Sequence, residues 1–344
     1  MKFKLSLIAF MLFLSSTYLF AQDLNSPADI IKVLEESKVG YEIGQLSEEV
    51  KPPDYSMNIN VAEFYTTENG GFEEIELDEA TFELKEETEV LFSSKKYEEA
   101  RENYLKIYEK YPKYSKIGTY IGQTYELEGD SETAVKWYKK SIDNNYIDYL
   151  AHWFLGRHYI KSGKTDKGIE QIMIAHILNR NATPILNDLI AVLEAQDIEY
   201  DNWVFNPQVK LTSKGKNQAS IEFGGDWLSY GLTKAVWAYE PGYKKTKGIG
   251  EDEESSLEDK EALLGLYIMT DGKKKAKKTP SIKALHLAGD NKLFDEYVLY
   301  ESFLTRIPIV AYQLSEDDIL ELVNYIKTVR CSPISKKKKK KRKK

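Results

Sequence analysis

The middle of the chain repeats a pattern of apolar, small and aromatic residues every 34 positions. The segment 121–129 (IGQTYELEG) returns as 155–163 (LGRHYIKSG), and Ala134 returns as Gly168. Within each repeat the apolar residues stand three or four positions apart, a spacing that places side chains on one face of a helix. The glycine that ends each segment suits a helix end with a left-handed backbone. The pattern therefore predicts repeated pairs of helices joined by a short turn.

This arrangement resembles the tetratricopeptide repeat (TPR) family, through the L-G-x2-Y and A-x3-F parts of its pattern, over residues 81–182. The resemblance implies a mostly α fold, a TPR α-solenoid of three helix-turn-helix units plus a capping helix at 183–199. Small residues would let the paired helices approach closely, and large ones would fill the space around them. The expected packing positions are Ala100, Tyr104, Gly122, Tyr125, Ala134, Tyr138, Gly156, Tyr159 and Gly168.

The first and third units depart from the family pattern. Glu87 and Thr88 stand where the other units have an apolar residue and glycine, and His152 stands where the family often has tryptophan. The capping helix is expected to begin with Thr183 as its cap and Pro184 in its first turn.

Residues 22–80 are expected to form an N-terminal extension. A short amphipathic helix should follow Ser26, and the β-branched and aromatic residues between Met57 and Leu77 favour a small hairpin around Gly70. Alternatively, the segment lies extended along the repeats.

Residues 200–335 are predicted to be a mainly helical C-terminal module of no assigned family. Helices are expected from a cap at Asp226 to Tyr239, then over 257–269, near 292–304 and over 316–329. Ser315 and Asp318 have the spacing of a capping box for the last of these. Residues 212–218 are expected to be a loop or short strand, and 220–223 an edge strand.

The first 21 residues have the form of a secretory signal peptide. Lys2 and Lys4 precede an apolar stretch, and Ala21 offers a small residue for cleavage. We therefore expect an exported protein, in the periplasm or outside the cell, cut after Ala21. An uncleaved N-terminal anchor is the alternative. The single cysteine, Cys331, excludes an internal disulfide and gives no support to thiol-ligated zinc.

The net charge of −7 combines two opposed parts. Residues 22–335 carry 37 basic and 55 acidic residues, a balance of −18, whereas the run from Lys336 to Lys344 is entirely basic. This tail is expected to be disordered. It is either a solvated end or a tether that binds anionic lipid, polysaccharide phosphate or nucleic acid.

No pattern for a cofactor, a metal or a catalytic centre emerges from the sequence. No C-x-x-C-H haem attachment is present, and His152 and His158 are six positions apart, which turns them in different directions on a helix. Gly224-Gly225 has no lysine to form a phosphate loop. We therefore predict no cofactor, no metal, no small-molecule substrate and no enzyme, with an enzymatic C-terminal module as a weaker alternative.

The resemblance places the expected function in a concave groove, where TPR proteins commonly hold an extended peptide or a partner helix. By repeat register, the groove residues are Phe82, Lys85, Glu89, Phe92, Lys116, Thr119, Gln123, Glu126, Leu150, Trp153, Arg157 and Ile160. Trp153 and Arg157 are of the types enriched at interface hot spots. The lysines and asparagines that grip a C-terminal carboxylate in one TPR subclass are replaced here by Glu89, Tyr120, Leu150 and Phe154.

The sequence thus predicts an exported scaffold that binds a protein or peptide partner, whose identity it does not give. The alternative function is the surface tether through the basic tail. The N-terminal extension or the C-terminal module could also occupy the groove themselves.

Overall fold

The computed structural model describes residues 24–53, 64–67 and 71–335. The chain forms two compact units. The sheet unit combines the residues up to Lys51 with Asn206–Ile282, and the repeat unit combines Pro52–Phe205 with the residues from Lys283 onward. These units cut across the expected boundaries, because both the extension 22–80 and the module 200–335 are divided between them. The expected signal peptide, 1–21, and the basic tail, 336–344, lie outside the described residues.

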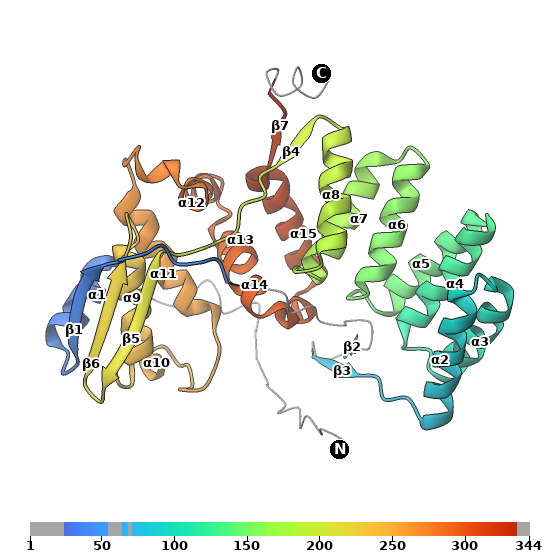
Figure 1. The fold of residues 1–344 in the computed structure, drawn as a ribbon, viewed down its shortest axis with the longest axis horizontal. Coiled ribbons are helices and arrows are strands. Elements are labelled where there is room, and N and C mark those ends of the chain that lie inside the picture. Colours follow the sequence, from blue (N-terminus) through green and yellow to red (C-terminus); the bar gives the residue numbers. More distant parts are fainter. Residues whose placement is uncertain (1–23, 54–63, 68–70, 336–344) are drawn as a thin grey trace. The chain divides into compact units, whose positions relative to one another are not determined.

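The repeat unit contains the predicted array of helix pairs, which follow one another side by side in Figure 1. Its helices are α2 (Glu79–Ser93), α3 (Tyr97–Lys110), α4 (Ser115–Glu128), α5 (Ser131–Asn144), α6 (Tyr149–Lys161), α7 (Thr165–Leu178) and α8 (Thr183–Ala195). Three pairs followed by a single helix confirm the mostly α fold and the TPR-like α-solenoid with a capping helix.

Close helix contacts occur at the small residues of the repeats. A Cβ atom on Gly122 would lie 2.7 Å from the ring of Tyr138, and one on Gly156 would lie 2.7 Å from Cγ1 of Ile172. Gly129 ends α4 in the left-handed conformation, with φ of 94°. The nine expected packing positions are buried, except for Tyr125 and Tyr159, which are half-buried.

One expected cap is wrong. The residue that caps α8 is Ala182, whose side chain cannot accept a hydrogen bond, and Thr183 is the first helical residue. Pro184 does lie in the first turn, as expected.

The C-terminal part of the chain continues the repeat unit. Its elements are α13 (Phe294–Tyr297), the π-helix η3 (Val298–Phe303), α14 (Leu304–Arg306), the 3-10 helix η4 (Pro308–Gln313), α15 (Glu316–Tyr325), the π-helix η5 (Ile326–Arg330) and strand β7 (Cys331–Pro333). The expected capping box of Ser315 and Asp318 is present. Strand β7 pairs antiparallel with β4 (Ile198–Tyr200), a contact that was not predicted.

The expected hairpin of the extension is present in its described residues. Strand β2 (Phe64–Thr66) pairs antiparallel with β3 (Phe72–Glu74). The rings of Phe64 and Phe72 both contact Tyr312 of η4, with centroids 6.2 and 5.8 Å away. The hairpin is therefore fixed to the C-terminal part of the repeat unit rather than lying extended, while residues 57–63 and 68–70 lie outside the described residues.

The sheet unit is an α+β structure. It contains α1 (Pro27–Glu36), β1 (Gly40–Gln45), β5 (Val209–Gly215), β6 (Gln218–Phe223), α9 (Leu228–Tyr239), α10 (Tyr243–Thr246), α11 (Ser256–Thr270) and the 3-10 helix η2 (Ala276–Lys278). Helix α12 (Pro280–Asp290) begins in this unit and ends in the repeat unit. The strand order is β1-β6-β5, with β1 parallel and β5 antiparallel to β6.

The sheet corrects two expectations. The strand predicted at an edge, 220–223, is part of the central strand β6, because β1 from the N-terminal part of the chain pairs with its free side. The residue before α9 is Trp227, and Asp226 does not cap the helix. Across the described part of the chain, no helix has both the length and the apolar character needed to span a bilayer.

Candidate functional site

The first helices of the three repeats, α2, α4 and α6, carry the predicted groove residues. Phe82 and Arg157 are exposed. The half-buried members are Glu89, Phe92, Gln123, Glu126, Leu150, Trp153 and Ile160. Three others, Lys85, Lys116 and Thr119, are buried, with 8%, 6% and 0% of their surface exposed. These three are therefore poorly placed to contact a partner.

Thr119 is buried because it joins one repeat to the next. Its hydroxyl donates to Oδ2 of Asp148 at 2.9 Å. The other oxygen of Asp148 accepts from the backbone nitrogen of Ala151 at 3.1 Å and so caps α6. Burial raises the pKa of the Asp148 carboxyl above its usual value, although these hydrogen bonds oppose the rise. Thr119 is thus part of the connection between repeats.

Ile160 also differs from its expected place. Its side chain occupies the space beside Gly168, where a Cβ atom would lie 2.5 Å from Cδ1 of Ile160. It therefore packs between α6 and α7, within its own repeat, and Gly168 provides the room for it.

The predicted groove residues form a row along α2, α4 and α6, and the α2 end of this row is aromatic. Phe92 packs against Tyr97 and Tyr120, with ring centroids 5.6 and 6.3 Å apart. Lys85 pairs with Glu89 at 3.3 Å and lies 5.5 Å from the ring centroid of Phe82. Phe82 itself keeps 51% of its surface exposed. An uncovered phenylalanine thus lies beside a lysine whose charge is already paired.

The α4 and α6 helices are connected by charged groups in the middle of the row. Glu126 lies 3.3 Å from the ammonium of Lys161 and 3.4 Å from Nδ1 of His158. His158 therefore has an acidic neighbour, whereas His152 is buried and contacts Gln171 at 2.7 Å and the carbonyl of Tyr146 at 2.9 Å. Burial lowers the pKa of His152, so the ring is neutral at physiological pH.

The α6 end of the row contains Trp153 and Arg157. The indole nitrogen of Trp153 donates to Oδ2 of Asp188 at 2.8 Å, and Nε of Arg157 lies 3.6 Å from the same oxygen. The guanidinium of Arg157 lies 5.8 Å from the centroid of the Trp153 ring. Asp188 belongs to the capping helix α8, so α8 fixes the orientation of both side chains. Asp188 is not among the groove residues expected from the repeat register, although the helical spacing of α8 could have indicated its face.

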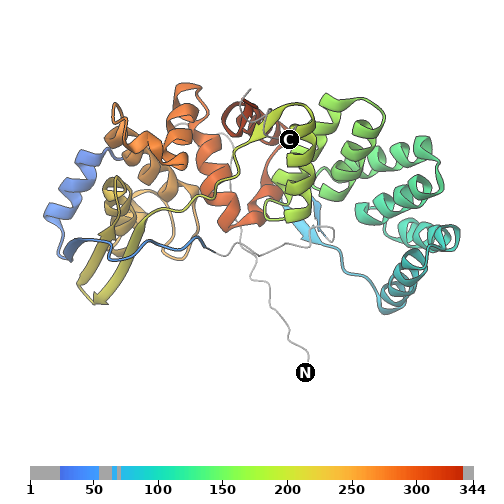
Figure 2. The same ribbon diagram turned by 45° about the horizontal axis from the view of Figure 1, so that its top comes forward.

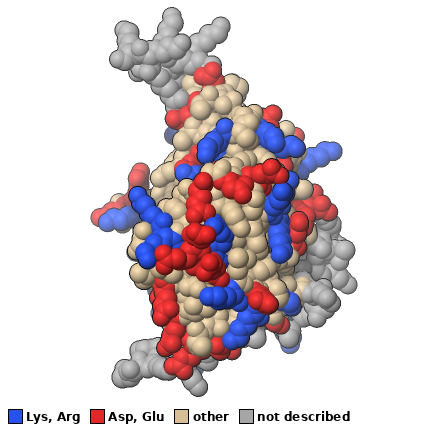
Figure 3. Space-filling model, turned by 90° about the vertical axis from the view of Figure 1, so that its right-hand side faces the viewer, with Lys and Arg blue, Asp and Glu red and all other residues tan. Residues whose placement is uncertain are grey.

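Charges of both signs are mixed on the face of the molecule in Figure 3, where lysine and arginine are interspersed with aspartate and glutamate. On this face neither sign of charge predominates. Cys331 is half-buried in β7, and burial raises the pKa of its thiol to about 11. The thiol is therefore protonated at neutral pH and is a poor nucleophile.

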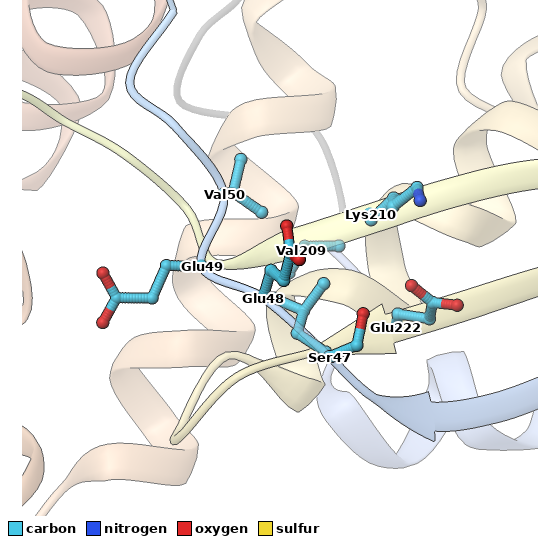
Figure 4. Close-up of a pocket in the computed structure, with 8 residues that line it drawn as sticks. Ser47, Glu48, Glu49, Val50, Val209, Lys210 and Glu222 are labelled. Atoms are coloured by element: carbon cyan, nitrogen blue, oxygen red, sulfur yellow. The ribbon is translucent and has the colours of Figure 1, made fainter.

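The sheet unit has a surface hollow of about 260 Å³ beside β5 and β6. Figure 4 shows Glu48, Glu222 and Lys210 around it, while the carboxylate of Glu49 points away from them. Ser47, Glu48, Glu49 and Lys210 are exposed, and the other lining residues are half-buried. Across the described residues, no group of histidine, cysteine, aspartate and glutamate side chains could hold a metal ion.

Comparisons with known proteins give a limited result. No protein-family model matches the chain. No curated protein sequence matches it either. Among solved structures, the chain is similar to the first TPR of Spaghetti (RPAP3) bound to the HSP90 peptide SRMEEVD. The identity is 20%, the match covers 34% of this chain and 92% of that chain, and the TM-score is 0.31. The repeats are TPR-like in their helix pairs and in the close contacts at Gly122, Gly156 and Gly168.

Proposed function

We propose that this protein is an exported, non-catalytic scaffold that binds a peptide or protein segment along α2, α4 and α6. The observation that carries the proposal is that this row has an exposed aromatic side chain at one end, Phe82, and the Trp153–Arg157 pair at the other. Tryptophan and arginine are among the residues that dominate binding energy at protein interfaces.

The contacts of the row favour a partner with apolar or aromatic side chains. Lys85, Glu126 and Arg157 already have ion partners within the chain, so a charged partner would have to displace them. Phe82 offers an unoccupied apolar surface. An apolar side chain on Phe82 and another on the Trp153 ring would gain burial without breaking an ion pair.

The proposal predicts that Trp153→Ala combined with Arg157→Ala abolishes capture of the partner. Each such anchor contributes about 2 kcal/mol or more to an interface, so the loss of one should lower the affinity about 30-fold and the loss of both should lower it further. Affinity capture from envelope extract, followed by mass spectrometry, measures the result. Lys139→Ala, on the exposed side of α5, is the matched control and should keep the partner. Unchanged capture by a folded double variant contradicts the groove as the binding site.

The alternative is the tether through Lys336 to Lys344, a segment outside the described residues. If the tail carries the function, its deletion should release the protein from anionic vesicles, and binding should weaken steeply with salt, since exposed charges are screened beyond about 8 Å at physiological ionic strength. The groove variant would then bind like the unaltered protein. The tether would be favoured if the groove variant captures the same partners as the unaltered protein and the protein without the tail captures none.

Export is a separate expectation of the proposal. The charged start, the apolar stretch and Ala21 predict a mature protein that begins at Gln22. N-terminal sequencing of the protein from its native host tests this. A retained Met1 on protein in the cytosol would contradict both cleavage and export.

A further inference from the structure

The sheet unit has exposed apolar side chains where α11 ends and α9 begins. Ile268 and Met269, in the last turn of α11, are 45% and 47% exposed, and Leu228, the first residue of α9, is 36% exposed. Figures 1 and 2 both show the chain that follows α11, drawn in orange, at the end of this unit away from the turn between β5 and β6. These side chains are separate from the groove row, which belongs to the repeat unit.

The three side chains lie around one end of the α9–α11 helix pair. The two helices run in opposite directions, because the last turn of α9 bonds to the first half of α11, whereas Ser229 at the start of α9 lies opposite Gly265. A Cβ atom on Gly265 would be 2.7 Å from the hydroxyl oxygen of Ser229. Ile268 and Met269 come three and four positions after Gly265, so they share its face of α11 one turn farther on. Since α9 begins at Leu228, no further turn of α9 covers this face.

A run of lysines follows α11 directly. Residues 273–278 read KKKAKK, and these lysines are exposed or half-buried. The run is ordered around Ala276, which is 1% exposed and begins the 3-10 helix η2. The backbone nitrogen of Lys273 donates to the carbonyl of Thr270 at 3.1 Å, and that of Thr279 donates to the carbonyl of Ala276 at 3.0 Å. The lysines are therefore held next to the end of α11.

These lysines are in excess over the acidic groups around them. Lys273 lies 3.9 Å from Asp226, which precedes α9, and Asp271 lies between α11 and the run. Within the described residues, ion pairs are absent from the other four lysines, Lys274, Lys275, Lys277 and Lys278. The acidic residues 251–254 precede α11 and so lie at its other end, about 22 Å away along a helix of 15 residues. Five lysines thus stand beside two carboxylates, and this end of the unit is positive.

Apolar side chains beside a group of lysines favour the surface of an anionic bilayer. At such a surface the lysine ammonium groups bind lipid phosphates, and neighbouring apolar side chains enter the boundary between headgroups and acyl chains. Each lysine near an anionic bilayer strengthens binding about fivefold. Nucleic acid also attracts lysines, but its phosphate backbone offers no apolar surface to cover Ile268 and Met269.

We propose that the end of α11 and the lysine run 273–278 form a surface that binds an anionic phospholipid bilayer. The lysines contact the lipid phosphates, and Ile268, Met269 and Leu228 enter the headgroup boundary. This surface belongs to the described part of the sheet unit and is distinct from both the basic tail and the groove row.

Flotation of the full chain with vesicles tests the role of charge. We expect the protein to bind vesicles of equal parts phosphatidylcholine and phosphatidylglycerol and not vesicles of phosphatidylcholine alone. The combined variant Lys274→Gln, Lys275→Gln and Lys278→Gln should bind the anionic vesicles at least about tenfold more weakly. No binding of the unaltered protein to anionic vesicles would overturn the proposal.

A second triple variant controls for net charge. Three exposed lysines of the repeat unit are replaced in it, as Lys106→Gln, Lys139→Gln and Lys167→Gln. It loses the same charge and should bind nearly as tightly as the unaltered protein. The basic tail is present in both triple variants, so its contribution cancels. Equal losses in the two triple variants would place the contact elsewhere and overturn the assignment to residues 273–278.

A pair of uncharged variants tests the insertion of the apolar side chains. Ile268→Gln combined with Met269→Gln leaves the net charge unchanged and should weaken binding at least about tenfold, because less apolar surface enters the bilayer. The control is Leu105→Gln combined with Leu127→Gln, at positions of the repeat unit that are 40% and 53% exposed, and it should bind like the unaltered protein. Unchanged binding by the Ile268 and Met269 variant would overturn the insertion.

A single-stranded oligonucleotide separates a bilayer from nucleic acid. At physiological ionic strength we expect no oligonucleotide binding that depends on residues 273–278. Oligonucleotide binding that the Lys274, Lys275 and Lys278 variant loses, and that the Ile268 and Met269 variant keeps, would overturn the proposal in favour of nucleic acid.

Discussion

Replacing Gly156 by leucine should lower the free energy of unfolding of the repeat unit by about 3 kcal/mol, the upper end of the usual cost of overpacking a core. Even the first atom of a side chain would lie 2.7 Å from Ile172 and 2.9 Å from the backbone oxygen of Gly168. The second of these atoms belongs to the backbone of α7 and cannot rotate away. Helices α6 and α7 would have to separate, and the third repeat would lose its internal packing.

Native-state hydrogen exchange in α6 and α7 measures this effect, because a chain with two compact units need not unfold in one step. Lys167→Leu is the matched control, since it adds the same side chain at an exposed position of α7. Protection that is equal in Gly156→Leu and Lys167→Leu would mean that the repeats do not pack through this glycine.

The repeats could be predicted because the residues that determine each helix pair lie close together in the sequence. Each pair of helices places its small and large residues at a fixed spacing, and the turn glycines, such as Gly129, mark the helix ends. The capping box at Ser315 was predictable for the same reason, since the two side chains concerned are three positions apart.

Pairings between distant segments could not be predicted in this way. Strand β1 pairs with β6, in which Gly40 and Gln218 are 178 positions apart, and β4 pairs with β7. The sequence pattern of a strand reflects only its own alternation of buried and exposed residues. It does not indicate which distant strand will pair with it. We therefore expected residues that follow one another in the sequence, such as 200–335, to form one module, whereas the structure divides them between two units.

The candidate groove was predictable in outline but not in detail. The repeat register selected Trp153 and Arg157, which lie together, and Phe82, which is exposed. It also selected Thr119, which the neighbouring repeat buries through Asp148. Register gives the direction of a side chain from its own helix, whereas burial depends on the adjacent repeat.

Glu301 should be among the most sensitive positions of the repeat unit. Its carboxylate is 1% exposed, pairs with Arg180 and Arg330, and accepts a hydrogen bond from the hydroxyl of Tyr325 at 2.7 Å. Glu301→Gln keeps the size of the side chain and removes its charge. Two buried guanidinium groups would then lack their common counter-ion, and breaking a buried ion pair in this way costs about 3–5 kcal/mol.

The exposed ion pair of Glu170 and Lys327 provides the matched control. These two side chains are 3.2 Å apart and 43% and 46% exposed, so Glu170→Gln should change the free energy of unfolding by about 1 kcal/mol or less. Denaturant unfolding followed by hydrogen exchange in α7 and α15 compares the two variants. Added salt should remove the small effect of Glu170→Gln and leave that of Glu301→Gln, because buried charges are screened little. Equal, small losses in both variants would show that the charge of Glu301 does not hold Arg180 and Arg330 in place.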